Sequence, residues 1–208
     1  MLRHIPKRSF VEGRWRNGLG VSWNIATQCV AGEIATQSVA GDIASRGDGE
    51  DFDWRFALAR IDGDVDFSVY GPVDRVFTMV AGEGLTLDFG AGKVIEVDAV
   101  NVPHAYACDV PLHCRVKGRG PALALNLFTA RGRWKAEVDV VALKGGTEVP
   151  LSCNAAVMLA LEGDCEISRS GERLHLREGD AAEVRGQGEL VASGGGYLYV
   201  GRLTLMSA

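Results

Sequence analysis

Hydrophobic and polar residues alternate along two long segments of the chain, residues 52–59 (Phe-Asp-Trp-Arg-Phe-Ala-Leu-Ala) and residues 122–128 (Ala-Leu-Ala-Leu-Asn-Leu-Phe). A period of two indicates strands, whereas no ten-residue segment has the 3.6-residue period of an amphipathic helix. The chain is therefore expected to be all-β. Shorter apolar runs bounded by Gly, Asp or Pro predict further strands at 21–26, 75–81, 85–89, 93–97, 112–116, 135–141, 156–161, 165–168, 172–176, 181–184, 189–192 and 197–205.

The strand predicted at 52–59 has one bulky face and one face of small residues. Arg55 lies on the small face with Ala57 and Ala59. Small side chains leave space on a barrel face, so we expect a cavity there in which Arg55 pairs with a carboxylate. In the alternative reading, Arg55 forms a structural ion pair, for example with Asp74, and the alanines only accept a neighbouring strand.

The strand predicted at 122–128 has the same division. Asn126 shares a face with Ala122, Ala124 and Phe128, while leucines occupy the other face. Asn126 is therefore expected to offer its amide group to a ligand in the same cavity.

A degenerate repeat links residues 80–97 with residues 161–176. Both segments have the order strand, glycine, strand, hairpin glycine, strand, and the second continues into a turn at 178–181. The glycines in equivalent positions are Gly82 and Gly92 in the first copy and Gly163 and Gly171 in the second. This spacing predicts two similar β units in one chain.

The two units are expected at 1–130 and 131–208, with terminal strands that can exchange between them. Residues 25–33 (IATQCVAGE) are repeated almost unchanged at 34–42 (IATQSVAGD). Two copies of nine residues are too few for a solenoid, so we interpret them as a duplication that enlarges a loop at 29–51.

Composition narrows the function classes. The 208 residues carry a net charge of −5 without a basic stripe, which argues against nucleic acid as a partner. No 18-residue apolar run and no secretory h-region are present, so no membrane contact and a cytoplasmic location are expected. Five cysteines without a C-x-x-C pair are typical of free thiols. The 27 glycines fit many short strands joined by tight turns.

The strand and glycine order of the two repeats resembles the cupin barrel. Five further segments resemble motifs of the HutD/Ves family in order and spacing, and together the resemblance covers residues 10–205. They are residues 15–26 (W-K-N-G-G-G-x-T-R-E-I in the family), 52–59 (F-x-W-R-x-S-x-A), 66–75 (P-F-S-x-F-P-G-x-D-R), 106–111 (F-x-G-D-x-P) and 125–128 (D-x-N-V-M).

The resemblance implies an all-β bicupin with two jelly-roll, cupin-like β-barrels and no metal centre. Some members of the family are associated with histidine-utilisation enzymes, and the role implied is sensing or buffering a pathway metabolite. This sequence departs from the family motifs at four positions. Trp23 and Asn24 replace Arg and Glu, Ala124 replaces Asp, and Leu19 replaces Gly. Three charged positions change together, so the ligand or its affinity is expected to differ.

Metal and nucleophile chemistry have little support in the sequence. The densest set of metal-ligand residue types is His104, Cys108, Asp109, His113 and Cys114, on a segment interpreted as a Pro-bounded turn leading into a strand. It contains neither H-x-H nor C-x-x-C, so neither a metal nor another cofactor is expected. A Cys–His nucleophile would need a depressed thiol pKa, whereas buried, inert cysteines are the expected reading.

We therefore predict a non-catalytic protein that binds a small polar metabolite bearing a carboxylate, for which the resemblance suggests a histidine-degradation intermediate such as urocanate or formylglutamate. No catalytic residue is assigned. Two alternatives remain open: a metal-independent isomerase or lyase that uses His104, His113 or Asp109, and a structural scaffold for a protein partner. A homodimer is a further expectation. The residues expected to contact the ligand are Trp15, Asn17, Ser22, Arg55, Arg75, His104 and Asn126.

Overall fold

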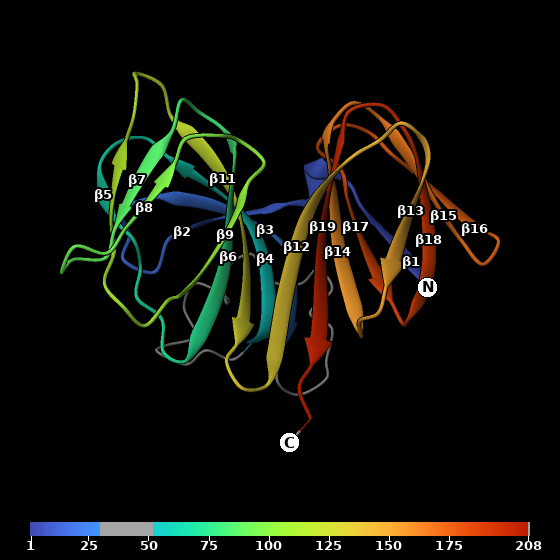
Figure 1. Cartoon of the computed structure of the whole chain (residues 1–208), viewed down its shortest axis with the longest axis horizontal. Helices are drawn as coiled ribbons and strands as arrows, with labels where there is room; N and C mark the ends of the chain where they lie inside the picture. The colour runs from blue at the N-terminus through green and yellow to red at the C-terminus, as the bar shows by residue number, and fades with distance from the viewer. Residues whose placement is uncertain (30–51, 208) are drawn as a thin grey trace. The chain divides into compact units, whose positions relative to one another are not determined.

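The structure, a computed structural model, describes residues 1–29 and 52–207. The chain divides into two compact units. The first unit is Val11–Gly132, and the second combines Met1–Phe10 with Arg133–Ala208. The strands of each unit are labelled in Figure 1.

The first unit contains two antiparallel sheets. The six-stranded sheet has the order β2 (Val11–Arg14), β3 (Val21–Cys29), β4 (Phe52–Ile61), β11 (Ala122–Ala130), β6 (Val73–Ala81) and β9 (Pro103–Ala107). The four-stranded sheet has the order β5 (Val65–Asp66), β10 (His113–Val116), β7 (Leu85–Asp88) and β8 (Val94–Val97).

Side chains from both sheets form the core of the first unit. Phe77 and Met79 of β6 pack in one cluster with Leu85 and Leu87 of β7. Full burial of such a side chain contributes about 1.5–3 kcal/mol, so this apolar layer holds the two sheets together.

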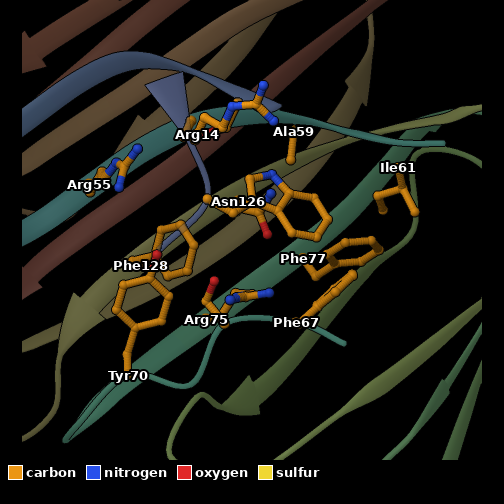
Figure 2. A pocket seen from close by; sticks show the side chains of 14 residues that line it. Arg14, Arg55, Ala59, Ile61, Phe67, Tyr70, Arg75, Phe77, Asn126 and Phe128 are labelled. Atoms are coloured by element: carbon orange, nitrogen blue, oxygen red, sulfur yellow. The ribbon is translucent and has the colours of Figure 1, made fainter. Parts of the chain in front are cut away.

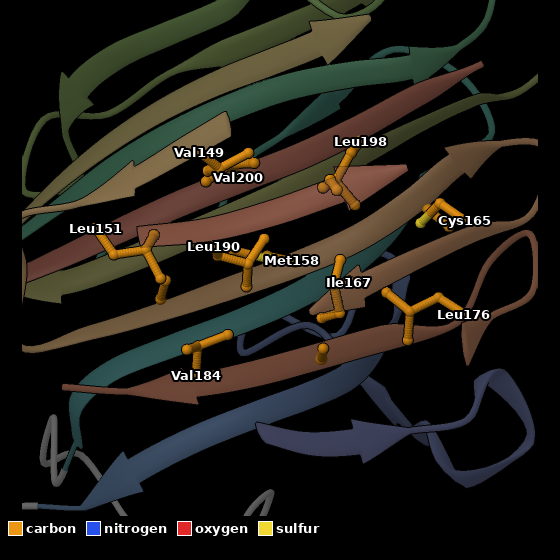
Figure 3. Packing of buried hydrophobic residues seen from close by; sticks show 14 of the residues in the cluster. Val149, Leu151, Met158, Cys165, Ile167, Leu176, Val184, Leu190, Leu198 and Val200 are labelled. Atoms are coloured by element: carbon orange, nitrogen blue, oxygen red, sulfur yellow. The ribbon is translucent and has the colours of Figure 1, made fainter. Parts of the chain in front are cut away.

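The second unit has the same two-sheet construction. Its five-stranded sheet has the order β1 (Leu2–Ile5), β17 (Ala181–Arg185), β14 (Ala155–Glu162), β19 (Tyr197–Leu205) and β12 (Trp134–Ala142). Its four-stranded sheet has the order β13 (Gly145–Leu151), β18 (Gly188–Gly194), β15 (Cys165–Arg169) and β16 (Glu172–Leu176). Figure 3 shows the apolar side chains of both sheets that form its core.

The first ten residues belong to the second unit because strand β1 pairs with β17. A short 3-10 helix, η1 (Lys7–Ser9), follows this strand. Arg3 forms an ion pair with Glu183, and the backbone N–H of Lys7 donates to a carboxylate oxygen of Asp180 at 2.8 Å. These contacts fasten the N-terminal segment to the unit that the C-terminal residues build.

The predicted repeat of strands and glycines is present in the structure. β6, β7 and β8 of the first unit correspond in order to β14, β15 and β16 of the second. The hairpin glycines Gly92 and Gly171 have φ angles of +81° and +83°, a region that side chains disfavour. The all-β class and the two jelly-roll-like units are confirmed, although the described strands form open paired sheets rather than closed barrels.

Five strands lie outside the predicted ranges, namely β1, β2, β5, β9 and β13. The segment that includes β9 was interpreted as a turn, which is wrong for Pro103–Ala107. All five lie at sheet edges, where proline and glycine are tolerated and apolar runs are short. Most of the predicted nine-residue duplication lies outside the described residues, as does the enlarged loop predicted at 29–51 except for Cys29, which is the last residue of β3. No helix in the described parts of the chain is both long enough and apolar enough to cross a membrane.

Candidate functional site

A pocket lies on the face of the six-stranded sheet that carries the small residues of β4. Its volume is about 50 Å³, which is room for a few water molecules or a small organic acid. Figure 2 shows the lining side chains from close by. The described residues that line the pocket are Arg14, Trp15, Ser22, Arg55, Ala57, Ala59, Ile61, Phe67, Ser68, Tyr70, Arg75, Phe77, Asn126 and Phe128.

Strand register brings the polar groups of the pocket onto one face. Arg55 of β4 lies opposite Phe128 of β11, which lies opposite Arg75 of β6. In the adjacent row, Ala57 lies opposite Asn126. Because side chains two residues apart share a face, Arg55, Ala57 and Asn126 project to the same side, as the alternation predicted. The small side chain of Ala57 leaves the space between them.

Arg75 is buried at the bottom of this space, with 6% of its surface exposed. Its guanidinium carbon lies 5.3 Å from the ring centre of Phe67, 5.5 Å from that of Tyr106 and 4.6 Å from that of Phe128. Nη1 donates a hydrogen bond to the Tyr106 hydroxyl at 3.2 Å, whereas the buried Nε has no partner. Three aromatic rings therefore hold the cation in position and leave part of its donor edge unused.

No anion compensates the charge of Arg75 among the described residues. Burial raises the pKa of the Tyr106 phenol and of the Cys108 thiol, so both groups are neutral at physiological pH. Asp74, which precedes Arg75, points to the opposite face of the strand, and its Oδ1 accepts a hydrogen bond from Arg131 Nε at 2.8 Å. An arginine stays protonated under all physiological conditions, so the pocket contains a full positive charge.

Arg55 is the second cation of the pocket. Its Nε donates to Asn24 Oδ1 at 3.1 Å, and the hydroxyl of Thr27 donates to the same oxygen at 2.9 Å. Burial lowers the pKa of Arg55, and the charge of Arg75 acts in the same direction. The alternative ion pair with Asp74 is not formed, because Arg131 occupies that carboxylate. The partner that Arg55 does have is neutral.

Asn126 contributes the buried amide of the pocket and is 4% exposed. Its Nδ2 donates to the backbone oxygen of Ala124 at 3.2 Å, two residues earlier on the same strand. Its Oδ1 is buried without a hydrogen-bond partner. Figure 2 shows Asn126 and Arg75 reaching from neighbouring strands toward the same space.

The glycine turn before β3 supplies one wall of the pocket. The indole N–H of Trp15 donates to the backbone oxygen of Val21 at 3.0 Å, and its ring packs edge-on against Phe67 with centres 5.4 Å apart. A Cβ atom at Gly20 would lie 2.5 Å from the Trp15 ring, so only glycine lets the indole close over the turn. Ser22 follows and lines the pocket.

Asn17 is outside the pocket and acts within the turn. Its Nδ2 donates to the backbone oxygen of Asp66 at 2.7 Å, and its Oδ1 accepts from the backbone N–H of Leu19 at 3.1 Å. Its own backbone N–H donates to the hydroxyl of Ser68, a lining residue, at 3.2 Å. Asn17 therefore contacts the lining residue Ser68 and does not line the pocket itself. This geometry does not support the direct ligand contact predicted for Asn17.

The predicted acid–base residues also lie elsewhere. His104 is half-buried on the edge strand β9, where it lies opposite the lining residue Phe77 without lining the pocket itself, and burial lowers its pKa. Asp109 is ion-paired with Arg131, and His113 Nδ1 lies 2.7 Å from Asp66 Oδ1. Of the seven residues predicted to bind ligand, five line the pocket, and Asn17 and His104 do not.

Cys108 and Cys114, which follow His104 in the sequence, do not have the lowered pKa of a nucleophilic thiol. Burial raises the pKa of Cys114 to about 12 and also raises that of Cys108. A depressed pKa is what a catalytic thiol needs, so the Cys–His alternative has no support. Among the described residues, no three or more His, Cys, Asp or Glu side chains are grouped to hold a metal ion.

Sequence reasoning missed the aromatic wall and the third arginine. Phe77 lies two residues after Arg75 and shares its face, a signal that the alternation of β6 contained. Phe67 and Tyr70 come from the irregular segment after β5, where periodicity says nothing about direction. Arg14 is exposed on the edge strand β2 and reaches the pocket through the strand order.

The two jelly-roll-like units in one chain define an all-β protein of the bicupin class. The pocket lined by arginines lies in the first unit. The sequence model of the HutD family matches residues 7–200, and the chain therefore belongs to the HutD family.

Relatives and solved structures agree with this assignment. Protein Ves from Cronobacter sakazakii is 32% identical over 90 residues, which are 43% of this chain and 49% of Ves. The chain thus spans about half the length of this curated relative. The structure of HutD from Pseudomonas fluorescens SBW25 (formate condition) covers 100% of both chains with a TM-score of 0.76 and 20% identity. A conserved protein of unknown function from Pseudomonas aeruginosa PAO1 covers 100% of both with a TM-score of 0.79 and 19% identity. At these identities the structural likeness concerns the fold.

Proposed function

We propose that this HutD-family protein binds a small metabolite bearing a carboxylate in the pocket of its first unit, and that it does so in the cytoplasm. The observation that carries this proposal is Arg75, a buried guanidinium that has no carboxylate partner among the described residues and borders a cavity. Histidine-degradation intermediates such as urocanate or formylglutamate are the first ligands to test, because of the family's association. Binding one of them would let the protein modulate that pathway.

The energetics of Arg75 favour an anionic ligand. Taking a charged group out of water costs several kcal/mol unless a partner of opposite charge compensates it. The three aromatic rings around Arg75 offset part of this cost. A carboxylate offsets the rest and also uses the idle Nε donor, since two parallel N–H···O bonds match the planar guanidinium.

The charge of the pocket contrasts with that of the chain. The described lining residues include three arginines, Arg14, Arg55 and Arg75, and no Asp or Glu. The whole chain carries a net charge of −5. A local positive concavity on an acidic protein attracts small anions selectively.

The lining residues favour binding over turnover. They include no His, Asp, Glu, Lys or Cys among the described positions, so a general base of suitable pKa is missing there. His104 and Asp109, which the enzyme alternative requires, lie outside the pocket. This geometry supports a protein that holds a metabolite unchanged.

Isothermal titration and thermal unfolding with matched ligands test the proposal. Propanoate is compared with propanamide, which has the same size but no charge, and then with urocanate and formylglutamate. We expect only the carboxylates to bind. At ten times the Kd, binding stabilises the fold by about 1.4 kcal/mol, which corresponds to roughly 3–5 °C in Tm.

Two arginine variants localise the effect. Arg75→Met removes the buried charge, whereas Arg60→Met removes an exposed arginine of β4 that pairs with Asp62 and does not line the pocket. Binding should be lost in the first variant and retained in the second. Equal binding of propanoate and propanamide, or unchanged binding in Arg75→Met, would contradict the proposal. If urocanate and formylglutamate bind no better than propanoate, the association with histidine degradation is withdrawn.

A further inference from the structure

Two buried polar atoms of opposite hydrogen-bonding character border the pocket without partners. Arg75 Nε is a donor, and Asn126 Oδ1 is an acceptor. Both residues are more than nine-tenths buried. A carboxylate satisfies the donor but leaves the acceptor unused, because a carboxylate has no proton to give at neutral pH. A ligand that satisfies both atoms therefore needs a hydrogen-bond donor in addition to its carboxylate.

The orientation of the Asn126 amide is fixed by its own strand. Nδ2 donates to the backbone oxygen of Ala124 at 3.2 Å. A flipped amide would bring its oxygen against that carbonyl oxygen and lose the hydrogen bond, so the acceptor is the amide atom that is left without a partner. The three lining arginines have only donors, and the lining hydroxyl groups of Ser22, Ser68 and Tyr70 both donate and accept, so among the described lining residues Asn126 Oδ1 is the side-chain atom that can only accept.

The two residues are diagonal neighbours on one face of the six-stranded sheet. Asn126 is paired with Phe77 across β11 and β6, and Arg75 lies two residues before Phe77 on the same face. Such diagonal neighbours have Cα atoms roughly 7–8 Å apart, and both side chains extend into the same space. One small ligand in this cavity of about 50 Å³ can therefore direct one group toward each residue.

We propose that the pocket selects small carboxylic acids that carry a neutral O–H or N–H donor beside the carboxylate, with hydroxy acids as the first class, and that Asn126 Oδ1 receives this donor. The inference rests on the proposed function and specifies its ligand class. An ammonium group is a poor donor here, because it would lie among the positive charges of Arg55 and Arg75. Hydroxy acids are therefore preferred over amino acids as well as over simple acids.

The preference has a physical reason in desolvation. A simple acid in the pocket gives Asn126 Oδ1 no hydrogen bond, so a buried acceptor remains unsatisfied. Sites built around a hydroxyl contact discriminate strongly against analogues that lack it. Lactate and propanoate differ only in this hydroxyl group.

Titration calorimetry with lactate, propanoate and alanine tests the inference. We expect the wild-type protein to bind lactate roughly tenfold or more tightly than propanoate, and to bind alanine more weakly than propanoate. In Asn126→Leu, lactate and propanoate should bind within about twofold of each other. Thr78→Val is the matched control. It removes another buried, unpartnered side-chain oxygen of the same sheet, outside the pocket, and should keep the preference.

The outcomes separate this inference from the proposed function. If neither acid binds at 10 mM, both the proposed function and the inference fail. If propanoate and lactate bind equally to the wild-type protein, the inference fails while the proposed function stands. A preference that survives in Asn126→Leu overturns the role of Asn126. Because the wild-type ratio is decisive by itself, the test does not depend on the folding of a variant.

Discussion

The guanidinium of Arg55 is held by Asn24, whose side-chain oxygen accepts from Nε at 3.1 Å. The contact fixes the direction of the cation without neutralising it. The HutD/Ves motif that this segment resembles has Glu at the position of Asn24. In this chain the amide keeps the hydrogen bond and leaves the positive charge of Arg55 available to a ligand.

Replacing Asn24 with Glu is expected to weaken anion binding. A carboxylate beside Arg55 would compensate its charge and repel an anionic ligand, which we expect to raise the Kd for propanoate about tenfold, or 1.4 kcal/mol. Titration at low and high salt measures the effect, which should shrink as salt screens the charges. Asn24→Gln has the same length without the charge and serves as the control. Equal weakening in both variants would show that shape, and not charge, is responsible.

Arg75→Met is expected to separate stability from binding. Methionine fills similar space between the rings of Phe67, Tyr106 and Phe128 and removes a buried charge that has no carboxylate partner among the described residues. The empty variant should be as stable as the wild type or up to about 2 kcal/mol more stable in urea unfolding. Carboxylate affinity should fall about 100-fold or more. A strongly destabilised variant would mean that Arg75 serves the fold and not the ligand.

Asp180 is expected to make the second unit sensitive to acid. Burial alone would raise its pKa, but hydrogen bonds from the Lys7 and Arg177 backbone and from His4 outweigh burial, and the pKa is lowered from its ordinary 3.8. A lowered pKa in the folded state adds stability above pH 3.8, and this stability is lost as the pH falls through the folded value.

Unfolding of Asp180→Asn across pH 3–7 measures this contribution. The variant should be about 1–3 kcal/mol less stable than the wild type at pH 6, because charged hydrogen bonds are lost, and the gap should close toward pH 3. Asp139→Asn, which removes an exposed partner of Arg202, should show little change at either pH. A gap that stays constant with pH would rule out the ionised carboxylate as its source.

The cysteines are expected to differ sharply in reactivity. Burial raises the pKa of Cys114 to about 12 and of Cys165 to about 11, and it also raises the pKa of Cys108 and Cys153. Only Cys29 is partly accessible. Alkylation at pH 8 followed by mass spectrometry should modify Cys29 alone in the native protein and all five thiols in urea. Native modification should disappear in Cys29→Ser, and rapid labelling of Cys114 would contradict this account.

Local alternation was sufficient to predict the centre of the pocket. Arg55, Ala57 and Asn126 lie on the predicted faces because β4 and β11 are long, central strands in which one face must pack. Asp74 and Arg75 point to opposite sides for the same reason. The side that each strand presents follows from its own residues, and no knowledge of the neighbouring strand is needed.

Other features depend on partners that are distant in the sequence. Arg14 and Tyr70 reach the pocket only because β2 and the segment after β5 are brought beside it by the sheet order. His104 has the chemistry of a binding residue and lies opposite Phe77, but on the edge strand β9 it is not one of the residues that line the pocket. Asn17 was expected to contact ligand, yet its amide is consumed by the backbone around the turn. Short-range patterns contain no information about such long-range competition.

The pairing of β3 with β4 has a consequence for how this family can diverge. Their register extends from Val21 opposite Arg60 to Cys29 opposite Phe52, so the pocket residues of both strands are positioned before the connection begins. Lengthening a connection costs little, since each doubling adds only about 0.6 kcal/mol. Tandem duplications such as the nine residues repeated here can therefore lengthen the connection between β3 and β4 at little cost in stability. The pocket residues on the two strands need not change when this connection does.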